Sequence, residues 1–580
     1  MVARGSTGSC KFPGLGPLIM RLFSRSPARP MSSPASGHAA RQGWSIEALV
    51  LLTLSLLVLL ANGPFWQSAL AERSWSAPAT WRFVITTAVL MVTVQAVPVL
   101  LLSTRRSVRP LLALLILCSA VALHMMQRYG VVLDPAMLRN ALRTDAREAA
   151  ELFNPGLLAS IGTALALGIG LWWLPLRQLA WPQAVKRRLL TVLVLVLLAV
   201  AALLLGFQDL SSTMRNQKGL RYQITPANVL YSASRAAASD VSTARAARLP
   251  PPPIERAAAA PGRKPQLLVV VVGETARAMN FSLNGYARPT NPVLAGWPVI
   301  NFPDTTACGT STEVSLPCMW SARGRADYDE ALIRRSESLP QLLHRAGLRV
   351  VWLDNQSGCK GLCGGIDTRD LSSGTDPVLC PDGRCFDGVL LKGLAEVLAE
   401  APAGPPRDTV VFLHQLGNHG PAYYKRYPAA FRRFTPECTR NELRECSQQE
   451  IVNAYDNAIL YTDHLLGEAL SFLKQRQDRY DVGLIYASDH GESLGEKGLY
   501  LHGMPRAIAP REQLAVPMLW WFGGEGASGW DGLDAACLRT RAQAPASHDN
   551  LYHSMLGLLQ IASPARVAER DLISACRPRR

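Results

Sequence analysis

Five long apolar segments in the first 206 residues constrain this chain more than any other feature of its sequence. Each approaches the roughly 20 residues that an α-helix needs to cross a bilayer. The third is the shortest and contains His124. We therefore expect residues 44–206 to form a five-helix transmembrane domain. The segments cover about residues 46–64, 80–102, 110–126, 156–175 and 189–206.

Basic residues between the segments predict their orientation. Arg41 precedes the first segment, a cluster at 105–109 separates the second from the third, and a cluster at 177–188 separates the fourth from the fifth. The positive-inside rule places all three in the cytoplasm, so everything after residue 206 lies on the outer side of the membrane. A cleaved signal peptide does not fit five consecutive segments. Residues 1–43 are polar and are expected to be disordered.

The loop between the third and fourth segments carries a further helical pattern at residues 134–153. Pro135 suits the start of a helix, and apolar residues recur along one stripe. Asn140, Thr144 and Glu148 are spaced by four, so one continuous helix would present them on one face at the outer surface. From spacing alone, an ordinary polar face on an interfacial helix is the favoured interpretation.

The net charge of +16 raises the question of nucleic-acid binding. Much of the basic excess lies beside apolar segments or in arginine-rich stretches before residue 265, and no nucleic-acid motif is present. A protein of a membrane surface is the better interpretation, and no nucleic-acid partner is expected.

Residues 207–265 are expected to connect the membrane domain to a separate domain at 266–580, since 580 residues are too many for one domain. In this second domain, strand-like and helix-like patterns alternate, which predicts a doubly wound α/β fold with a largely parallel sheet. The strands are expected at 267–272, 348–353, 409–413, 482–487 and 516–522, and the helices at 339–345, 389–398 and 450–475.

Ten of the twelve cysteines lie in the second domain and fall into sequence neighbours. On the outer side of a membrane, five disulfides are the favoured interpretation. A four-thiolate zinc site formed by the second and third pairs is the alternative. The ten are Cys308, Cys318, Cys359, Cys363, Cys380, Cys385, Cys438, Cys446, Cys537 and Cys576.

Residues able to bind a metal follow several of the predicted strands. Glu274 follows the first strand, and Asp489 with His490 follows the strand at 482–487. Carboxylates and imidazoles are typical zinc ligands, and the ends of parallel strands gather at one edge of the sheet. A hydroxyl cluster around Thr312, between two cysteines, precedes a helix expected to begin near Val314. A helix N-terminus favours an oxyanion, so this set suits metal-assisted phosphoryl transfer.

The runs GETAR, CGTSTEVSLPC, NHGPAYYKRY and SDHGES resemble the phosphoethanolamine–lipid A transferases, which include the mobile colistin-resistance enzymes. The resemblance extends from about residue 44 to the end and implies an alkaline phosphatase/sulfatase-type catalytic domain in the periplasm of a bacterial inner-membrane protein. It implies that Thr312 is the nucleophile. Glu274, Asp489 and His490 would bind zinc, with Thr312 as the fourth ligand.

Other residues match positions that contact substrate in this family. The resemblance implies a phosphate site or second zinc site near His419 and His502, and a membrane-proximal set that contacts the donor. His414 and His464 are interpreted as structural, and Gln356 stands where relatives often carry Asn. The matched substrate residues are His419, His502, Lys360, Ser357, Thr310, Asn140, Thr144 and Glu148.

The implied reaction moves phosphoethanolamine from phosphatidylethanolamine to a lipid A phosphate through a phosphothreonine intermediate. Zinc suits this chemistry because it lowers the pKa of a bound hydroxyl and screens phosphate charge. Inner-membrane lipids are the implied surroundings, and a monomer is expected. The alternatives are another envelope acceptor such as a lipopolysaccharide core sugar, a membrane hydrolase of sulfatase or phosphatase type, and a membrane sensor without activity.

Overall fold

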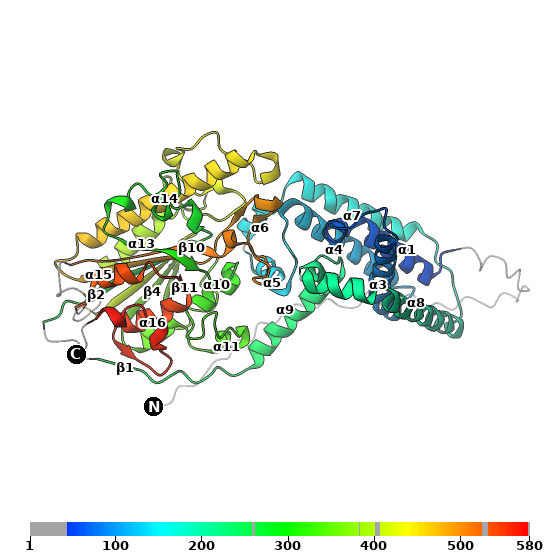
Figure 1. Ribbon diagram of the computed structural model, residues 1–580, viewed down its shortest axis with the longest axis horizontal. Coiled ribbons are helices and arrows are strands. Elements are labelled where there is room, and N and C mark those ends of the chain that lie inside the picture. Colours follow the sequence, from blue (N-terminus) through cyan, green and yellow to red (C-terminus); the bar gives the residue numbers. More distant parts are fainter. Residues whose placement is uncertain are drawn as a thin grey trace, which may run out of the picture.

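The computed structural model has a helical part and an α/β part, joined by a long helix (Figure 1). It describes residues 43–144, 146–217, 219–257, 262–381, 383–400, 407–524, 530 and 532–577. The predicted disorder of residues 1–43 lies outside these ranges except at Gly43.

Among the described residues, four helices of the first part are long and apolar enough to cross a membrane, and a bent pair of shorter helices forms a fifth candidate. The pair, α1 and α2, is bent by 55°. This count agrees with the five apolar segments predicted. Leucines such as Leu204 on α8 face outward, as expected for lipid-facing helices. The helices are α1 (Ile46–Leu60), α2 (Gly63–Leu70), α3 (Pro78–Leu102), α4 (Val108–Tyr129), α7 (Pro155–Trp173) and α8 (Trp181–Asn216).

The single helix predicted at 134–153 is wrong, because the chain forms two helices, α5 (Pro135–Arg143) and α6 (Ala146–Leu152). Thr144 has an extended backbone, and its hydroxyl donates a hydrogen bond back to the carbonyl of Asn140 at 2.8 Å. Threonine side chains compete in this way with the helical backbone. Asn140, Thr144 and Glu148 therefore do not share one helical face.

The connector contains α9 (Ala227–Arg245), which leads from the membrane part along the α/β part (Figure 1). Its N-terminal end is fastened to the membrane part. The Asn62 side chain accepts a hydrogen bond from Thr225 N at 2.7 Å and donates one to Thr225 O at 2.9 Å. Ser232 donates to the carbonyl of Leu133.

The second part is built on an eight-stranded sheet. The sheet is largely parallel, as predicted, with one exception: β10 runs antiparallel to both of its neighbours. In the central strand β2, Gly273 lies opposite Ser488 of β7 and Val272 lies opposite His414 of β6. The strand order is β11 (Ala546–Ser547), β3 (Ile300–Thr306), β10 (Ala515–Phe522), β7 (Asp481–Ser488), β2 (Gln266–Gly273), β6 (Thr409–His414), β4 (Arg349–Asp354) and β5 (Asp367–Asp370).

Helices cover both faces of this sheet (Figure 1). Side chains of β2 alternate between two hydrophobic cores, because successive residues of a strand point to opposite faces. Val270 belongs to the core that includes α12, α15 and α16, and Val271 to the core that includes α13 and α14. This is the doubly wound arrangement that the alternating sequence pattern predicts. The helices are α10 (Thr312–Met319), α11 (Glu330–Arg335), α12 (Leu339–Arg345), α13 (Gly388–Ala399), α14 (Gln448–Lys474), α15 (Ala535–Arg541) and α16 (Asp549–Leu558).

Two small antiparallel pairs lie outside the main sheet. They are β1 (Glu255–Arg256) with β12 (Ile561–Ala562), and β8 (Ser493–Leu494) with β9 (Tyr500–Leu501).

Among the described residues, five disulfides cross-link the α/β part, each between cysteines that are neighbours in the order of the sequence. The predicted disulfides are therefore present, and the alternative four-thiolate zinc site is wrong, because its cysteines are paired as disulfides. The pairs are Cys308–Cys318, Cys359–Cys363, Cys380–Cys385, Cys438–Cys446 and Cys537–Cys576.

Candidate active site

Two neighbouring strands bring three possible metal ligands together. Glu274 directly follows β2, and Asp489 and His490 directly follow β7, whose last residue pairs with the last residue of β2. One ligand atom of each of the three lies within 4.8 Å of the others, and all three side chains are fully buried. Parallel neighbouring strands of matched length thus place residues more than 200 positions apart in one cluster.

Thr312 joins this cluster from the first position of α10, with Ser311 as the N-cap. Its hydroxyl lies 3.1 Å from both carboxylate oxygens of Glu274 and 3.4 Å from Nε2 of His490. The first turn of a helix presents unpaired N–H groups and the positive end of the helix dipole, which favour negative charge. The helix begins two residues earlier than expected from sequence, so the hydroxyl belongs to the helix itself.

The three possible ligands influence each other's protonation strongly. Burial and the charge of Glu274 raise the pKa of Asp489 to about 7. Burial alone would lower the pKa of His490, but the carboxylates of Asp489 and Glu274 raise it to about 10. Burial would raise the pKa of Glu274, yet the hydrogen bond and charge of His490 lower it overall. Two buried carboxylates therefore lack sufficient positive charge, which a divalent cation would supply.

The donor set fits zinc in type and number. Zinc takes carboxylate oxygen and imidazole nitrogen and commonly has four ligands. Oδ2 of Asp489 is buried and accepts no hydrogen bond from the described residues. A buried carboxylate oxygen without a donor is explained by a cation at this position.

The predicted phosphate-site histidines lie beside this cluster. The His502 ring centroid is 4.4 Å from that of His490 and 5.3 Å from that of His419. Nδ1 of His502 lies 2.8 Å from the Glu492 carboxylate, which also accepts a hydrogen bond from Tyr423 at 2.6 Å. Glu492 therefore orients His502, and the sequence reasoning did not assign it this role.

The hydrogen bonds of the other predicted substrate residues are made to residues outside the metal-ligand cluster. Lys360 donates hydrogen bonds to the carbonyl and hydroxyl of Ser357 at 3.0 and 2.7 Å, so these two form one unit. Thr310 donates its hydroxyl to the carbonyl of Met504 at 2.6 Å. The side chain of Glu148 lies outside the described residues. Their contact with substrate stays a prediction.

The remaining histidine predictions concern structural roles. Nδ1 of His414 lies 2.9 Å from the Asp354 carboxylate, and both side chains are buried. The ring of His464 packs against Phe431 with centroids 4.9 Å apart. These contacts fit the structural interpretation of both residues.

An ion-pair network connects α10, the helix that begins at Thr312, to the membrane part. Glu313, directly after Thr312, is buried and pairs with Arg334 of α11 and Arg143 of α5. Arg143 also pairs with Asp240 of α9 at 3.2 Å. Helix α5 is thereby connected, through Arg143, to Glu313, the residue next to the candidate nucleophile.

A second network ties α6 to the loop that carries His419. Glu151 of α6 pairs with both terminal nitrogens of Arg426, and Arg426 Nε donates a hydrogen bond to the carbonyl of His419 at 2.6 Å. Arg384 forms a further ion pair with Glu151 at 3.2 Å. The sequence reasoning did not find these arginines, because their partners lie far away along the chain.

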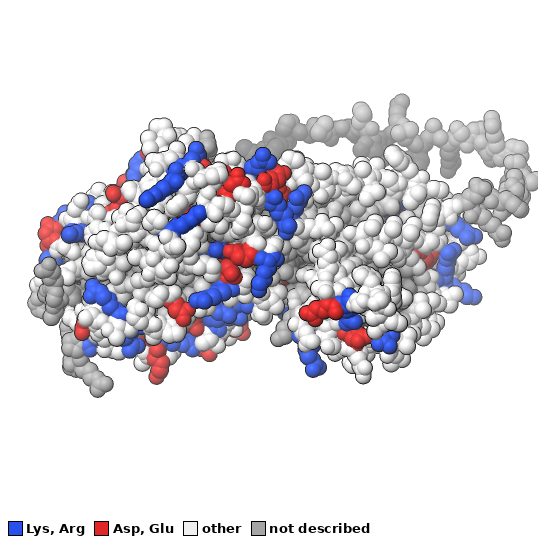
Figure 2. Space-filling model, turned by 45° about the horizontal axis from the view of Figure 1, so that its top comes forward, with Lys and Arg blue, Asp and Glu red and all other residues white. Residues whose placement is uncertain are grey.

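Charged side chains are dense over the catalytic part and sparse over much of the membrane part (Figure 2). Basic side chains gather at the end of the membrane part farthest from the catalytic part (Figure 2). This agrees with an orientation that places that end in the cytoplasm.

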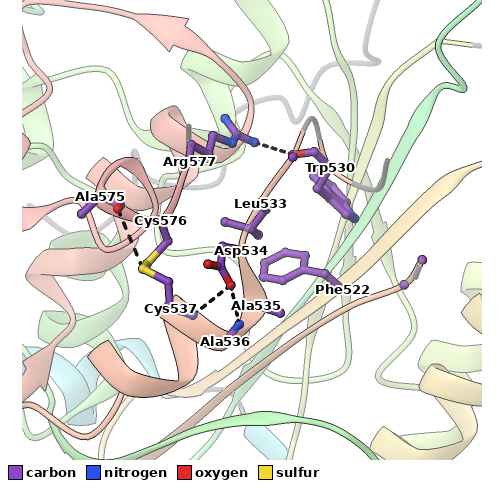
Figure 3. Close-up of a pocket in the computed structure, with 13 residues that line it drawn as sticks. Phe522, Trp530, Leu533, Asp534, Ala535, Ala536, Cys537, Ala575, Cys576 and Arg577 are labelled. Atoms are coloured by element: carbon purple, nitrogen blue, oxygen red, sulfur yellow. Dashed lines mark hydrogen bonds between the residues drawn. A yellow bond between two sulfur atoms is a disulfide. The ribbon is translucent and has the colours of Figure 1, made fainter. Parts of the chain in front are cut away.

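A cavity of about 710 Å³ lies away from the cluster, between the end of β10 and the start of α15 (Figure 3). Asp534 points its carboxylate at the amides of Ala536 and Cys537, where it caps α15 (Figure 3). Arg577 donates to the Trp530 carbonyl (Figure 3). These polar groups serve the local fold, so the cavity is not the candidate active site.

Comparisons with known proteins agree with this geometry. Residues 266–561 match the family model "Sulfatase", and residues 91–241 match "Phosphoethanolamine transferase EptA/EptB". The chain is 39% identical over 477 residues to phosphoethanolamine transferase EptA of Escherichia coli K12, covering 81% of this chain and 86% of the relative. It is 40% identical over 496 residues to phosphatidylethanolamine transferase Mcr-1 of Escherichia coli, covering 83% and 90%.

A solved structure matches nearly the whole chain. The integral membrane lipooligosaccharide phosphoethanolamine transferase A of Neisseria meningitidis superposes with a TM-score of 0.86 at 34% identity. The match covers 92% of this chain and 99% of that one. The arrangement of the membrane and catalytic parts is therefore shared with this relative.

Proposed function

The chain belongs to the phosphoethanolamine transferase family, a group of multi-pass inner-membrane enzymes, and we propose that it transfers phosphoethanolamine from phosphatidylethanolamine to a lipid A phosphate. One observation carries the proposal: the Thr312 hydroxyl lies at a helix N-terminus, 3.1 Å from Glu274 and beside Asp489 and His490. A hydroxyl, an anion-favouring helix end and a possible metal-binding set thus lie in one buried cluster, which supports the proposal.

The proposed first step forms a phosphothreonine. The Thr312 oxygen attacks the phosphorus of the donor, a Thr312 O–P bond forms, and the P–O bond to diacylglycerol breaks. Glu274 accepts a hydrogen bond from the Thr312 hydroxyl and so orients it, and the hydroxyl proton leaves to solvent when the oxygen ionises. His419 and His502 are the neighbouring imidazoles available to protonate the departing diacylglycerol oxygen.

Zinc is the proposed cofactor, held by Glu274, Asp489, His490 and Thr312. When bound, it favours the ionised form of the threonine oxygen and screens the negative charge of the phosphate. A second zinc near His419 and His502 is part of the same proposal.

In the proposed second step, a lipid A phosphate oxygen attacks the phosphorus held on Thr312. The Thr312 O–P bond breaks, and the threonine oxygen regains its proton. The product carries an added ammonium group, so its net negative charge falls. Cationic peptides such as polymyxin and colistin then bind the envelope less strongly.

In this proposal each part of the chain has its own role. Residues 44–206 anchor the enzyme, 207–265 connect, and 266–580 catalyse in the periplasm. Donor and acceptor are both amphiphiles, so a catalytic part held at the membrane meets their head groups there. Asn140, Thr144 and Glu148, at the junction of α5 and α6, are proposed to contact the donor.

The decisive test is mass spectrometry of lipid A from a Gram-negative host with and without the gene. We expect a gain of one phosphoethanolamine group, and we expect Thr312→Ala to abolish it. Ser311→Ala is the matched control, since the neighbouring Ser311 side chain makes no capping hydrogen bond. Unchanged modification with Thr312→Ala would refute the proposal.

The alternative acceptor, a core sugar, is favoured by one comparison. The chain is 27% identical over 552 residues to Kdo(2)-lipid A phosphoethanolamine 7''-transferase of Escherichia coli K12. Fragmentation of the modified glycolipid separates the two, because the added mass stays with lipid A in one case and with the core sugar in the other.

A further inference from the structure

A buried histidine outside the candidate ligand set lies between the two chain segments that build the site. His548 directly precedes α16, and only 1% of its surface is exposed. Its Nδ1 accepts a hydrogen bond from the amide of Cys308 at 3.1 Å. Its Nε2 lies 2.9 Å from the carbonyl of Ser488, to which it donates.

These two contacts connect the nucleophile to the metal-binding residues. Cys308 begins the loop that leads to Thr312, and Ser488 is the residue directly before Asp489. An imidazole between them fixes the spacing of the loop and the strand end. Without the imidazole, the amide of Cys308 and the carbonyl of Ser488 would each lose a hydrogen-bond partner while buried, which costs free energy.

Ser315 reinforces the same link from within α10. It lies one turn after Thr312, its hydroxyl donates to the carbonyl of Asp489, and it accepts a hydrogen bond from Gly309 N at 3.3 Å. The Ser315 hydroxyl also lies 3.4 Å from Nδ1 of His548. Two side chains, Ser315 and His548, thus connect α10 to the end of β7, and they also contact each other.

The geometry requires one tautomer of His548. Nδ1 must present a lone pair to an N–H group, and Nε2 must carry the proton that it gives to a carbonyl. A neutral imidazole alone provides an acceptor and a donor on opposite sides of one rigid ring. Burial keeps the ring neutral, because it lowers the pKa of His548 to about 4.

We propose that His548 is a positioning residue that sets the distance between the Thr312 hydroxyl and the Asp489–His490 pair. This inference rests on the proposed function of the site, since it assigns His548 a role in the reaction of Thr312. Its effect is on the alignment of the reacting groups, so it should appear in kcat and in zinc retention while leaving the KM for the donor lipid unchanged. A misplacement of about 1 Å at a reacting centre can lower the rate about a hundredfold.

Two conservative variants dissect the link. In His548→Asn, the side-chain oxygen can still accept near the Nδ1 position, but the contact with Ser488 is lost. In His548→Gln, the amide nitrogen can reach toward Ser488, but the acceptor for Cys308 is lost. We expect each to lower kcat by about ten- to a hundredfold at an unchanged KM for phosphatidylethanolamine, and to lose zinc to EDTA faster than the unmodified chain.

The same helix offers a matched control. His553 of α16 is also buried, its Nδ1 accepts from the amide of Val567 at 3.1 Å, and burial lowers its pKa to about 4 as well. Its hydrogen bond serves the C-terminal loop and not the site. His553→Gln should lower the unfolding temperature to a similar extent, yet leave kcat within about twofold.

Ser315→Ala provides a second variant of small volume change, should the histidine variants fold poorly. It removes the hydroxyl link to the Asp489 carbonyl and should lower kcat in the same direction. All variants are measured as the full chain in detergent, with the donor lipid and a lipid A acceptor. If the unmodified chain transfers phosphoethanolamine but the His548 and Ser315 variants retain full kcat, or if His553→Gln loses kcat equally, the inference is overturned. If the unmodified chain itself transfers nothing, the proposed function fails instead.

Discussion

The proposed zinc binding should depend on pH, because the three possible ligands Glu274, Asp489 and His490 have shifted pKa values. Without a metal, burial and the charge of Glu274 raise the pKa of Asp489 to about 7, and the carboxylates of Asp489 and Glu274 raise that of His490 to about 10 against the effect of burial. Zinc requires an ionised carboxylate and a neutral imidazole. Both protons must therefore leave before these two residues can bind the ion.

The number of protons released on binding sets how steeply the zinc association constant changes with pH. Below pH 7, each bound zinc displaces one proton from Asp489 and one from His490, and between pH 7 and 10 it displaces only that of His490. Glu274 contributes none, because His490 lowers its pKa. Each released proton changes the association constant about tenfold per pH unit, or about 1.4 kcal/mol. The constant should thus rise about 10⁴-fold from pH 5 to 7, but only about 10²-fold from pH 7 to 9.

The assay is competition for zinc between the full chain in detergent and a chelator of known pH dependence. Calorimetry in buffers of different ionisation enthalpy counts the released protons directly. A proton from Thr312, where its oxygen binds as an alkoxide, adds one to both ranges and disappears in Thr312→Val. The step of one proton near pH 7 belongs to Asp489. In Asp489→Asn this proton should no longer be released, and the step of His490 should lie below pH 10, because the carboxylate that raises its pKa is gone. A pH-independent affinity, or a slope that does not fall by one proton across pH 7 in the unmodified chain, would refute this reasoning.

Two other predictions concern the supports of the site. Replacing Cys308 and Cys318 together by serine should lower the free energy of unfolding by about 3 kcal/mol, because the bridge closes a loop with a sequence separation of 10, and urea unfolding of the full chain in detergent measures it. Arg426→Lys keeps the charge but loses the two-nitrogen contact with Glu151, so hydrogen exchange of α6 should accelerate at least tenfold. Arg384→Lys, which alters a contact of one nitrogen with Glu151 at 3.2 Å, should change this exchange less, and equal effects of both variants would contradict the assignment.

The central strands of the sheet could be predicted from sequence because they are buried on both faces. The run from Leu267 to Val272 is continuously apolar, as expected of a strand covered by helices on both sides. The strand β3 was missed, because its sequence INFPDTT contains a proline and several polar residues. The antiparallel direction of β10 could not be read from Val516–Phe522 either, since an apolar run does not encode strand direction.

The candidate ligands could be predicted because they follow strands directly, so sequence position fixed their place at one edge of the sheet. The break at Thr144 could not, because spacing by four fits one helix as well as two. The extended backbone of Thr144, which ends α5, is what divides this stretch into two helices. His548 also carried no signal in the sequence. A histidine before a helix is common, and its role depends on Cys308 and Ser488, which lie 240 and 60 residues away.

The ion pairs around Glu313 make the membrane part a structural component of the catalytic site. Glu313 is a buried carboxylate next to Thr312, the candidate nucleophile, and one of its two arginine partners, Arg143, comes from α5 of the membrane part. Removing one partner of a buried ion pair leaves a charge without compensation, which is unfavourable. The catalytic part alone therefore retains its metal-binding residues but lacks part of the charge that neutralises the start of α10. Attachment to the membrane thus does more than confine the enzyme near its lipids, because it also completes the surroundings of Thr312.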